Sequence, residues 1–255
     1  RRVLFRSDAR QSIGQLAKWG HTRLRLGAST TACQHLLPPV LGRFKEQFPH
    51  CQISVHPGDT PVATDLLLEN RIDLALALEP CNEPRLEFQL LFTDELVFLV
   101  GASHPWAKAG AVVRDEIPAQ NYILYNKGSY TFRLVQDYFR REGVALNSLI
   151  EVGSMETSKE LVKLGLGVSI LAPWIAQREL RDGTLVSLPL GRRKLKRNWG
   201  ILQRAGRPLS LAEETFIKLC RETTEEVVKG EGVKTVPAPA APAAMPVGSV
   251  LLKAV

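Results

Sequence analysis

The sequence predicts an α/β protein built from two Rossmann-like lobes. Short apolar strands alternate with amphipathic helices along most of the chain, which is typical of layered α/β folds. This alternation restarts after His104-Pro105, and a last strand and helix follow the second series, which indicates that the chain returns to the first lobe. With 255 residues, the chain is long enough for two lobes of roughly 100 residues each.

The first series begins with a strand and a long helix. Apolar residues recur at helical spacing between Leu36 and Phe48, and Pro38 and Pro39 fall within the first two turns, where a missing N–H matters least. Asn70 is suited to end the next helix in a left-handed conformation. The expected strands are Leu24–Gly27, Gln52–His56, Leu74–Leu78, Leu86–Phe92 and Glu95–Val100, and the expected helices are Thr31–Gln47 and Val62–Glu69.

The second series repeats this order of strand and helix. Gly143 and Gly183 each follow a helical stretch and are suited to end it. The expected strands are Tyr122–Tyr125, Ile150–Val152, Val168–Leu171, Leu185–Leu188 and Trp199–Arg204, and the expected helices are Thr131–Glu142, Ser158–Leu164, Pro173–Leu180 and Leu211–Val228.

The net charge of +7 is concentrated at the two ends of the chain. Residues 1–25 contribute +6 and residues 229–255 contribute +2, which leaves −1 for the residues between them. A nearly neutral body is not the electrostatic footprint of a nucleic-acid-binding domain. The basic run that remains there, Arg192–Arg197, is expected to be a solvated turn between strands. Residues 229–255 are rich in Ala, Pro, Val and Gly without periodicity, which predicts a disordered tail.

Several classes of protein are disfavoured by what the sequence lacks. The four cysteines form no Cys-x-x-Cys pair, so neither a disulfide framework nor a zinc site is expected, and a cytoplasmic location fits best. No apolar run approaches the roughly 20 residues that span a bilayer, and residues 1–20 do not resemble a secretory signal. The absence of an initiator Met suggests a fragment of a longer protein.

Motifs for catalysis are also missing. The sequence has no Gly-x-Ser-x-Gly, no His-Glu-x-x-His and no P-loop, and its five histidines do not pair at ligand spacing, so no enzymatic activity, metal or cofactor is expected. Gly165-Leu-Gly167 follows a helix and precedes a strand, the reverse of a dinucleotide-binding loop, and indicates a helix C-cap. Cys33 is either a half-buried helix thiol or a thiol sensor.

An ordered set of short motifs resembles the effector-binding domain of LysR-type transcription regulators, over roughly residues 21–228. The motifs are Leu24-Arg-Leu-Gly-Ala-Ser-Thr-Thr, Leu36-Leu-Pro-Pro-Val-Leu, Phe44-Lys-Glu-Gln-Phe-Pro, Arg71-Ile-Asp-Leu-Ala-Leu-Ala, Asp94-Glu-Leu-Val-Phe-Leu-Val, His104-Pro-Trp-Ala, Val162-Lys-Leu-Gly-Leu-Gly-Val, Ile170-Leu-Ala-Pro and Glu179-Leu-Arg-Asp-Gly-Thr-Leu. The signal comes from their order, since no single motif is diagnostic.

The resemblance implies a type 2 periplasmic-binding-protein-like fold, in which two crossover strands join the lobes and the ligand binds between them. The crossovers are expected near Val100–Ser103 and Asn198–Gln203. Residues 21–103 and 199–228 would form lobe I, and residues 104–198 lobe II. Residues 1–20 would be the remnant of a linker helix, with a non-native origin left open for Arg1–Arg6.

The resemblance also implies partners. Family members pair these domains side by side as homodimers that form tetramers, and the helix Leu36–Phe48 is expected to supply part of that interface. DNA would be bound only through a helix-turn-helix domain that this chain lacks, and no membrane partner is expected. The effector is expected to be a small metabolite, anionic because helix N-termini would face the cleft.

Three strand-to-helix turns carry side chains suited to such a cleft. The first contains Ser29, Thr30 and Thr31; a single N-cap needs only one hydroxyl, and Ser29 and Thr31 match best the family positions that touch effectors. The second contains Ser129, Tyr130 and Thr131, of which Ser129 or Thr131 could act only as a cap.

The third turn contains Ser154 and Met155, and the spacing of Thr157 and Glu160 there predicts a capping box that would occupy the Thr157 hydroxyl. Asp59 and Glu79 follow two further strands. Each could bind a cation, repel a wrong ligand, or serve only as a turn residue.

Two other functions compete with an effector sensor. A periplasmic solute-binding protein of the same fold would carry an export signal. An enzyme on that fold would carry an acid and a base in the cleft, and the sequence shows no such pair.

Overall fold

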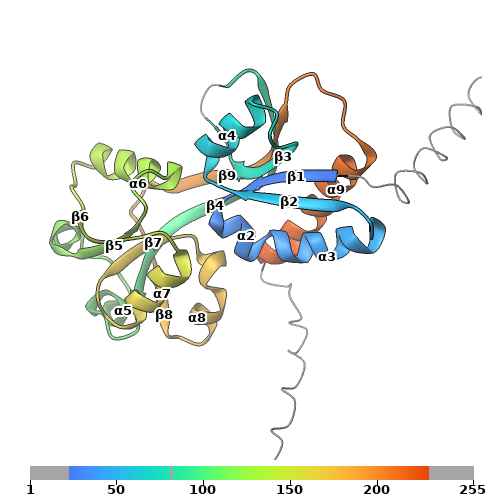
Figure 1. Ribbon diagram of the computed structural model, residues 1–255. Helices are drawn as coiled ribbons and strands as arrows, with labels where there is room; N and C mark the ends of the chain where they lie inside the picture. Colours follow the sequence, from blue (N-terminus) through green and yellow to red (C-terminus); the bar gives the residue numbers. More distant parts are fainter. Residues whose placement is uncertain (1–22, 81–82, 230–255) are drawn as a thin grey trace, which may run out of the picture.

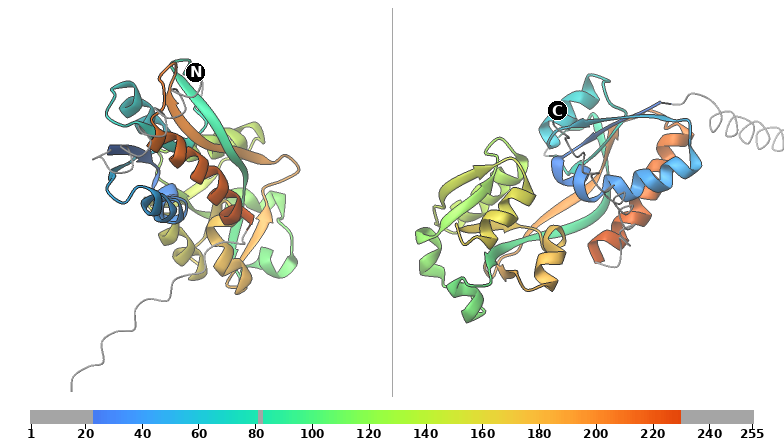
Figure 2. Two further views of the ribbon diagram at one scale, coloured as in Figure 1. Left: turned by 90° about the vertical axis from the view of Figure 1, so that its right-hand side faces the viewer. Right: turned by 60° about the horizontal axis from the view of Figure 1, so that its bottom comes forward.

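The computed structural model describes residues 23–80 and 83–229. The expected linker remnant and residues 230–255 of the expected tail lie outside the described residues. Two α/β lobes lie side by side, and two long strands run from one lobe into the other (Figure 1). The turned views of Figure 2 show the same two strands passing between the lobes. This arrangement is the α/β fold of two lobes that the sequence predicts.

Lobe I is centred on three parallel strands. β1 (Arg23–Ala28) pairs with β2 (Gln52–Pro57) on one side and with β3 (Leu74–Leu78) on the other. Helices follow the carboxyl ends of β1 and β2, as parallel pairing requires a crossover connection. These helices are α2 (Thr30–His35), α3 (Leu37–Gln47) and α4 (Thr60–Leu68). The carboxyl ends of these strands therefore meet at the edge that faces the other lobe.

Lobe II repeats this plan with β5 (Asn121–Tyr125) between β6 (Asn147–Val152) and β7 (Val168–Leu171), all parallel. β8 (Leu185–Pro189) pairs with the end of the long strand β4 (Leu86–Gly101). The helices of lobe II are α5 (Pro105–Ala109), α6 (Tyr130–Arg141), α7 (Met155–Lys163) and α8 (Gln177–Arg181), with 3₁₀ helices at Arg114–Ala119 and Pro173–Ala176.

The two crossovers are β4 (Leu86–Gly101) and β9 (Leu195–Arg204), which pair antiparallel. β4 pairs with β9 as far as Leu96 and then, from Val97 onward, with β7 and β8. β4 therefore passes from lobe I to lobe II before Val100–Ser103, the position at which the first crossover was expected. β9 also begins four residues before the expected Trp199, because Leu195 continues the alternation of the strand.

β4 is one strand, whereas two separate strands were expected at Leu86–Phe92 and Glu95–Val100. The register with β9 shifts between Leu90 and Phe92, so the strand bends there without ending. Gly200 of β9 faces this bend, and a Cβ at that position would collide with the backbone oxygen of Gln89. Thr93 and Asp94, which lie between the two expected strands, continue the ladder with β9.

The expected helix Thr31–Gln47 is two helices, α2 and α3, which meet at Leu36. In one continuous helix, Pro38 and Pro39 would leave the carbonyls of Gln34 and His35 without donors. At the start of α3 the missing N–H groups cost nothing. The expected helix Pro173–Leu180 likewise divides into the 3₁₀ helix and α8.

The final helix α9 (Leu211–Lys229) packs against lobe I. Phe44 of α3 stacks on Phe48 and meets Phe216 of α9 edge to face, which buries all three rings. At the other end, Ser210 and Glu213 exchange hydrogen bonds as a capping box.

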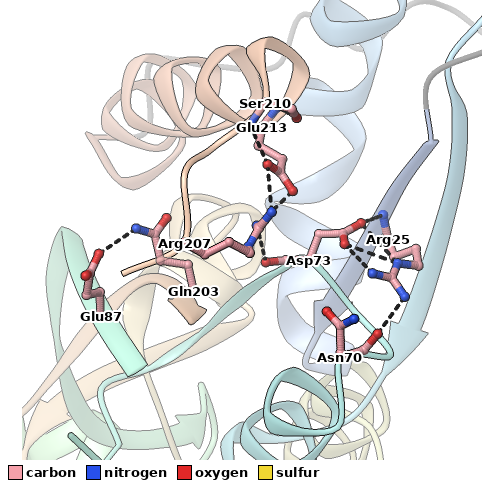
Figure 3. Close-up of polar contacts among 8 residues, drawn as sticks. All are labelled: Arg25, Asn70, Asp73, Glu87, Gln203, Arg207, Ser210 and Glu213. Carbon is pink, nitrogen blue, oxygen red and sulfur yellow. Dashed lines mark hydrogen bonds and ion pairs between the residues drawn. The ribbon is translucent and has the colours of Figure 1, made fainter. Parts of the chain in front are cut away.

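A polar network fixes the start of α9 to the sheet (Figure 3). Arg207 donates to Glu213 and to the backbone oxygen of Asp73. The Asp73 carboxylate in turn accepts from the backbone and the guanidinium of Arg25 in β1. Asp73 therefore ties β1 to the loop before β3, on the side of the sheet where the parallel strands begin. Within the described residues, no helix is long and apolar enough to cross a membrane.

Candidate functional site

A small cavity lies between the lobes, beside the point where β9 crosses from one to the other. Its volume is about 20 Å³, which holds roughly one water molecule. Its lining comes from lobe I (Ser29, Thr31, Asp59, Thr60, Leu78), from lobe II (Tyr125, Tyr130, Thr131, Met155) and from β9 (Arg197, Trp199). We call this the inner cavity.

A larger outer cavity of about 410 Å³ adjoins it. The two share Leu78, Tyr130 and Arg197, so these three residues separate the inner cavity from the more open space. The outer cavity is further lined by Glu79, Thr93, Leu134, Lys196 and Asn198. The Glu79 carboxylate accepts a hydrogen bond of 2.8 Å from Asn198 Nδ2. Glu79 is thus tied to β9, outside the inner cavity.

The first turn divides its three hydroxyls among different tasks. Ser29 is the N-cap of α2, and its Oγ accepts from the N–H of Ala32 at 3.3 Å. Thr31 is buried and faces the inner cavity, and its hydroxyl makes no hydrogen bond with any described residue. Thr30 does not line the cavity; it lies beside Tyr125 of lobe II, where its hydroxyl acts to lower the pKa of the phenol while burial raises it. Of the three, Thr31 has the hydroxyl that a ligand could use at no structural cost.

The second turn also separates a cap from a cavity residue. Ser129 is buried, and its Oγ accepts from the N–H of Phe132 at 3.0 Å as the N-cap of α6. It does not line the inner cavity, whereas Tyr130 and Thr131 do. The Thr131 hydroxyl accepts a hydrogen bond of 2.9 Å from Nη1 of Arg197, which links lobe II to β9.

The third turn begins α7 earlier than expected. Ser154, not Thr157, is the N-cap, and its Oγ accepts from the N–H of Thr157. The predicted capping box of Thr157 and Glu160 is therefore wrong: Thr157 lies within the first turn, and Glu160 pairs with Lys163. Met155 is buried and lines the inner cavity, while Ser154 does not.

Asp59 lies at the N-cap of α4 but makes no capping hydrogen bond. Pro61 occupies the second position of the helix and has no N–H to offer. The carboxylate instead lines the inner cavity. Burial raises the pKa of Asp59, and the positive charge of Arg197 opposes this rise. The neighbouring Thr60 hydroxyl is fully used, because it both donates to and accepts from the backbone of Leu78.

Arg197 is the charged lining residue that was not predicted, because its basic run was expected to be a solvated turn. Thr60, Leu78, Tyr125 and Trp199 also line the cavity without having been predicted. Arg192, Arg193 and Lys194 are indeed exposed, but Arg197 is only 4% exposed. Its Nε and Nη2 donate to the two oxygens of Asp94 in β4. With the bond to Thr131, three of its five N–H groups are used, which leaves two for another acceptor.

The Asp94 carboxylate is satisfied from several directions. Besides Arg197, it accepts 2.9 Å hydrogen bonds from the indole N–H groups of Trp174 and Trp199. Trp199 lines the inner cavity, and Trp174 belongs to lobe II. Both crossover strands and lobe II therefore meet at one buried carboxylate.

A second cluster joins the lobes at the end of α2. Nε2 of His35 lies 3.2 Å from Oε1 of Glu156 in α7, and its ring meets Trp174 edge to face. Lys159 is buried and pairs with both Glu156 and Glu179. Burial lowers the pKa of His35, and the negative charge of Glu156 acts in the opposite direction.

Neither a metal site nor a reactive cysteine is supported by the described part of the chain. No group of three or more His, Cys, Asp or Glu residues there could hold a metal ion. Burial raises the pKa of Cys33, which disfavours a reactive thiolate. Gly165 has a φ of 75° just after α7, which confirms that Gly165-Leu-Gly167 ends a helix.

The fold and the cleft define a class of protein: two-lobed domains of the type 2 periplasmic-binding-protein-like fold. The regulatory domain of CcmR from Synechocystis PCC6803, solved in complex with 2-PG, matches with a TM-score of 0.70 and 28% identity over 80% of this chain and 98% of that one. The effector binding domain of QuiR, solved in complex with shikimate, has the same fold, with a TM-score of 0.68 and 23% identity over 81% of this chain and 99% of that one.

Residues 20–225 match the model of the LysR substrate binding domain, and the chain belongs to this family. Among curated proteins, the uncharacterized HTH-type transcriptional regulator YeiE of Escherichia coli (strain K12) is 28% identical over 221 residues. That match covers 86% of this chain and 74% of the relative.

Proposed function

We propose that this chain senses a small effector for a LysR-type transcription regulator and has no enzymatic activity. The observation that carries the proposal is the inner cavity, which hydroxyl side chains of both lobes line together with Arg197 of a crossover strand. A ligand held by both lobes would favour one arrangement of the lobes over others. The names of the relatives support a role in transcription rather than in solute uptake.

The effector is proposed to be a small metabolite that carries an anionic oxygen. Two N–H groups of Arg197 and the free hydroxyl of Thr31 would hold that oxygen, with Ser29 and Thr131 beside it. The ligands named for the two solved relatives, 2-PG and shikimate, agree with this chemistry. We keep Ser29, Thr31, Asp59, Tyr130, Thr131 and Met155 as effector-binding residues and add Arg197. Ser129 and Ser154 would instead act on the site as helix N-caps, and Thr30 through its contact with Tyr125.

The remaining partners follow from the same proposal. The domain would act in the cytoplasm as a homodimer within a larger assembly, with the solvent-facing side of α3 in the interface. A separate helix-turn-helix domain would bind the DNA. Sedimentation of the chain at micromolar concentration tests the proposed homodimer, because a strictly monomeric species would count against this interface.

Thermal shift with a metabolite library tests the sensing function. A compound at 100 times its Kd should stabilise the chain by about 2.7 kcal/mol. Arg197→Gln should weaken the response to the best compound, whereas Arg192→Gln, which changes an exposed residue of the same basic run, should not. A library of carboxylates, phosphates and sugars in which no compound stabilises the chain would contradict the proposal.

A further inference from the structure

Asp59 is a carboxylate without a donor. Among the described residues, no side chain or backbone N–H donates a hydrogen bond to it, although an N-cap position usually supplies one. Its side chain is half-buried and lines the inner cavity. Both carboxylate oxygens are acceptors, so they are available to a hydrogen-bond donor of the molecule that occupies the cavity.

Arg197 does not satisfy Asp59. Its charge acts on Asp59 only at a distance. Its Nε and Nη2 donate to Asp94, and its Nη1 donates to Thr131. The charges of Asp94 and Arg197 cancel, and the Asp59 carboxylate adds an uncompensated negative charge at the cavity. A ligand that offered only anionic oxygens would therefore meet repulsion on this side.

A ligand with a second, hydrogen-donating group removes this conflict. Its anionic oxygen would accept from Arg197 and Thr31, while an O–H or N–H of the same molecule would donate to Asp59. Building on the function proposed above, we infer that the effector is a bifunctional small acid, which presents a hydroxyl or an ammonium group to Asp59 in addition to its anionic oxygen. Asp59 then distinguishes an acid that carries such a donor from the same acid without a hydroxyl or ammonium group.

The test compares matched ligands on matched variants. The library contains acids in sets that differ at one carbon, such as succinate, malate and aspartate, together with sugar acids and phosphorylated acids. For the best ligand and its analogue without the donor, titration calorimetry gives Kd for the wild type, for Asp59→Ala and for Asp65→Ala. Asp65 lies on the exposed side of the same helix, so its substitution removes the same charge away from the cavity.

We expect the best ligand to carry a donor and to bind Asp59→Ala about tenfold more weakly or worse, the loss of a hydrogen bond to a charged group. The analogue without the donor should bind wild type and Asp59→Ala with similar Kd, and Asp65→Ala should behave as wild type. Asp59→Asn separates the two kinds of donor: a hydroxyl ligand keeps most of its affinity, and an ammonium ligand does not.

Two results would overturn the inference while leaving the proposed function intact. The strongest ligand could carry no donor, or Asp59→Ala could bind a donor-bearing ligand as tightly as the wild type. If no acid, phosphate or sugar of the library binds the wild type, the proposed function itself fails, and the inference fails with it.

Discussion

At the scale of single residues, the pair of Asp94 and Arg197 has a consequence for stability. Both side chains are only 2% exposed, and they bridge the two crossover strands. Replacing Asp94 by Asn would leave the Arg197 charge buried without its partner. We expect the free energy of unfolding, measured by urea denaturation, to fall by about 3–5 kcal/mol.

The neighbouring pair of Glu95 and Lys194 provides the control. It also joins β4 to the chain before β9, but Lys194 is 63% exposed. Glu95→Gln should change the free energy of unfolding by no more than about 1 kcal/mol, as for other surface pairs. Equal losses for the two variants would show that burial does not decide how much each ion pair contributes to stability.

Thr31 and Ser29 should show opposite behaviour on substitution. Thr31→Val keeps the shape of the side chain and removes the hydroxyl that faces the inner cavity. Effector binding, measured by calorimetry, should weaken by about 1–3 kcal/mol. The melting temperature should hardly change, because that hydroxyl bonds to no described residue.

Ser29→Ala removes the N-cap of α2 and should lower the free energy of unfolding by about 1 kcal/mol. Thr31→Val with wild-type affinity would show that the Thr31 hydroxyl plays no part in binding the effector.

The sequence predicts candidate effector-binding residues in strand-to-helix turns. Six of them line one cavity, namely Ser29, Thr31, Asp59, Tyr130, Thr131 and Met155, and their binding of an effector stays a prediction. The sequence could not predict Arg197. That residue ends a run of basic residues whose other charges are solvated, and nothing local distinguishes it. Only the register of β9 on β4, which places Arg197 opposite Asp94, gives it a buried partner. The signal was therefore in the pairing of strands more than 100 residues apart.

At the scale of helices and strands, the errors have a common cause. The pattern of apolar residues located α3 and β4 correctly, but it could not show that α2 ends at Leu36 or that β4 passes Asp94 without a break. The first depends on two prolines that must start a helix rather than continue one. The continuity of β4 depends on tertiary partners, because Arg197, Trp174 and Trp199 bury and bond the Asp94 carboxylate within the strand. Short elements such as α5 were missed because one or two turns carry too few residues to show periodicity.

The contact between α2 and α7 predicts a pH dependence. Burial holds the pKa of His35 below its ordinary value of 6.5, with Glu156, Lys159 and Glu179 as the charges that face it. The unfolded chain therefore binds this proton more readily than the folded chain. Stability should rise with pH from the lowered folded-state value up to about 6.5, and the contribution should be lost on acidification.

Melting temperatures of wild type and His35→Gln between pH 5 and 7.5 test this sign. The difference between them should shift with pH in favour of the wild type as pH rises. His50→Gln, at an exposed histidine, should keep the wild-type profile. The opposite slope for His35→Gln would mean that attraction to Glu156 outweighs burial.

At the scale of the whole molecule, the inner cavity is too small for a metabolite while the lobes are arranged as described. About 20 Å³ admits one water molecule, so an effector can enter only when the lobes separate or the lining side chains move. β4 and β9 are the two connections between the lobes and would absorb such a motion. Contacts that hold the lobes together, such as Thr30 with Tyr125, would then oppose binding.

This arrangement predicts how fast an effector binds. In stopped-flow experiments that follow tryptophan fluorescence, to which Trp199 in the cavity wall contributes, the observed rate should level off at high effector concentration, because opening limits it. Thr30→Val breaks a contact between the lobes without altering the cavity lining, so it should raise the plateau. Ser169→Ala, which removes a hydrogen bond to Ile123 within lobe II, should leave the plateau unchanged. A rate that rises linearly with concentration for every variant would mean that the effector reaches its site without any opening of the lobes.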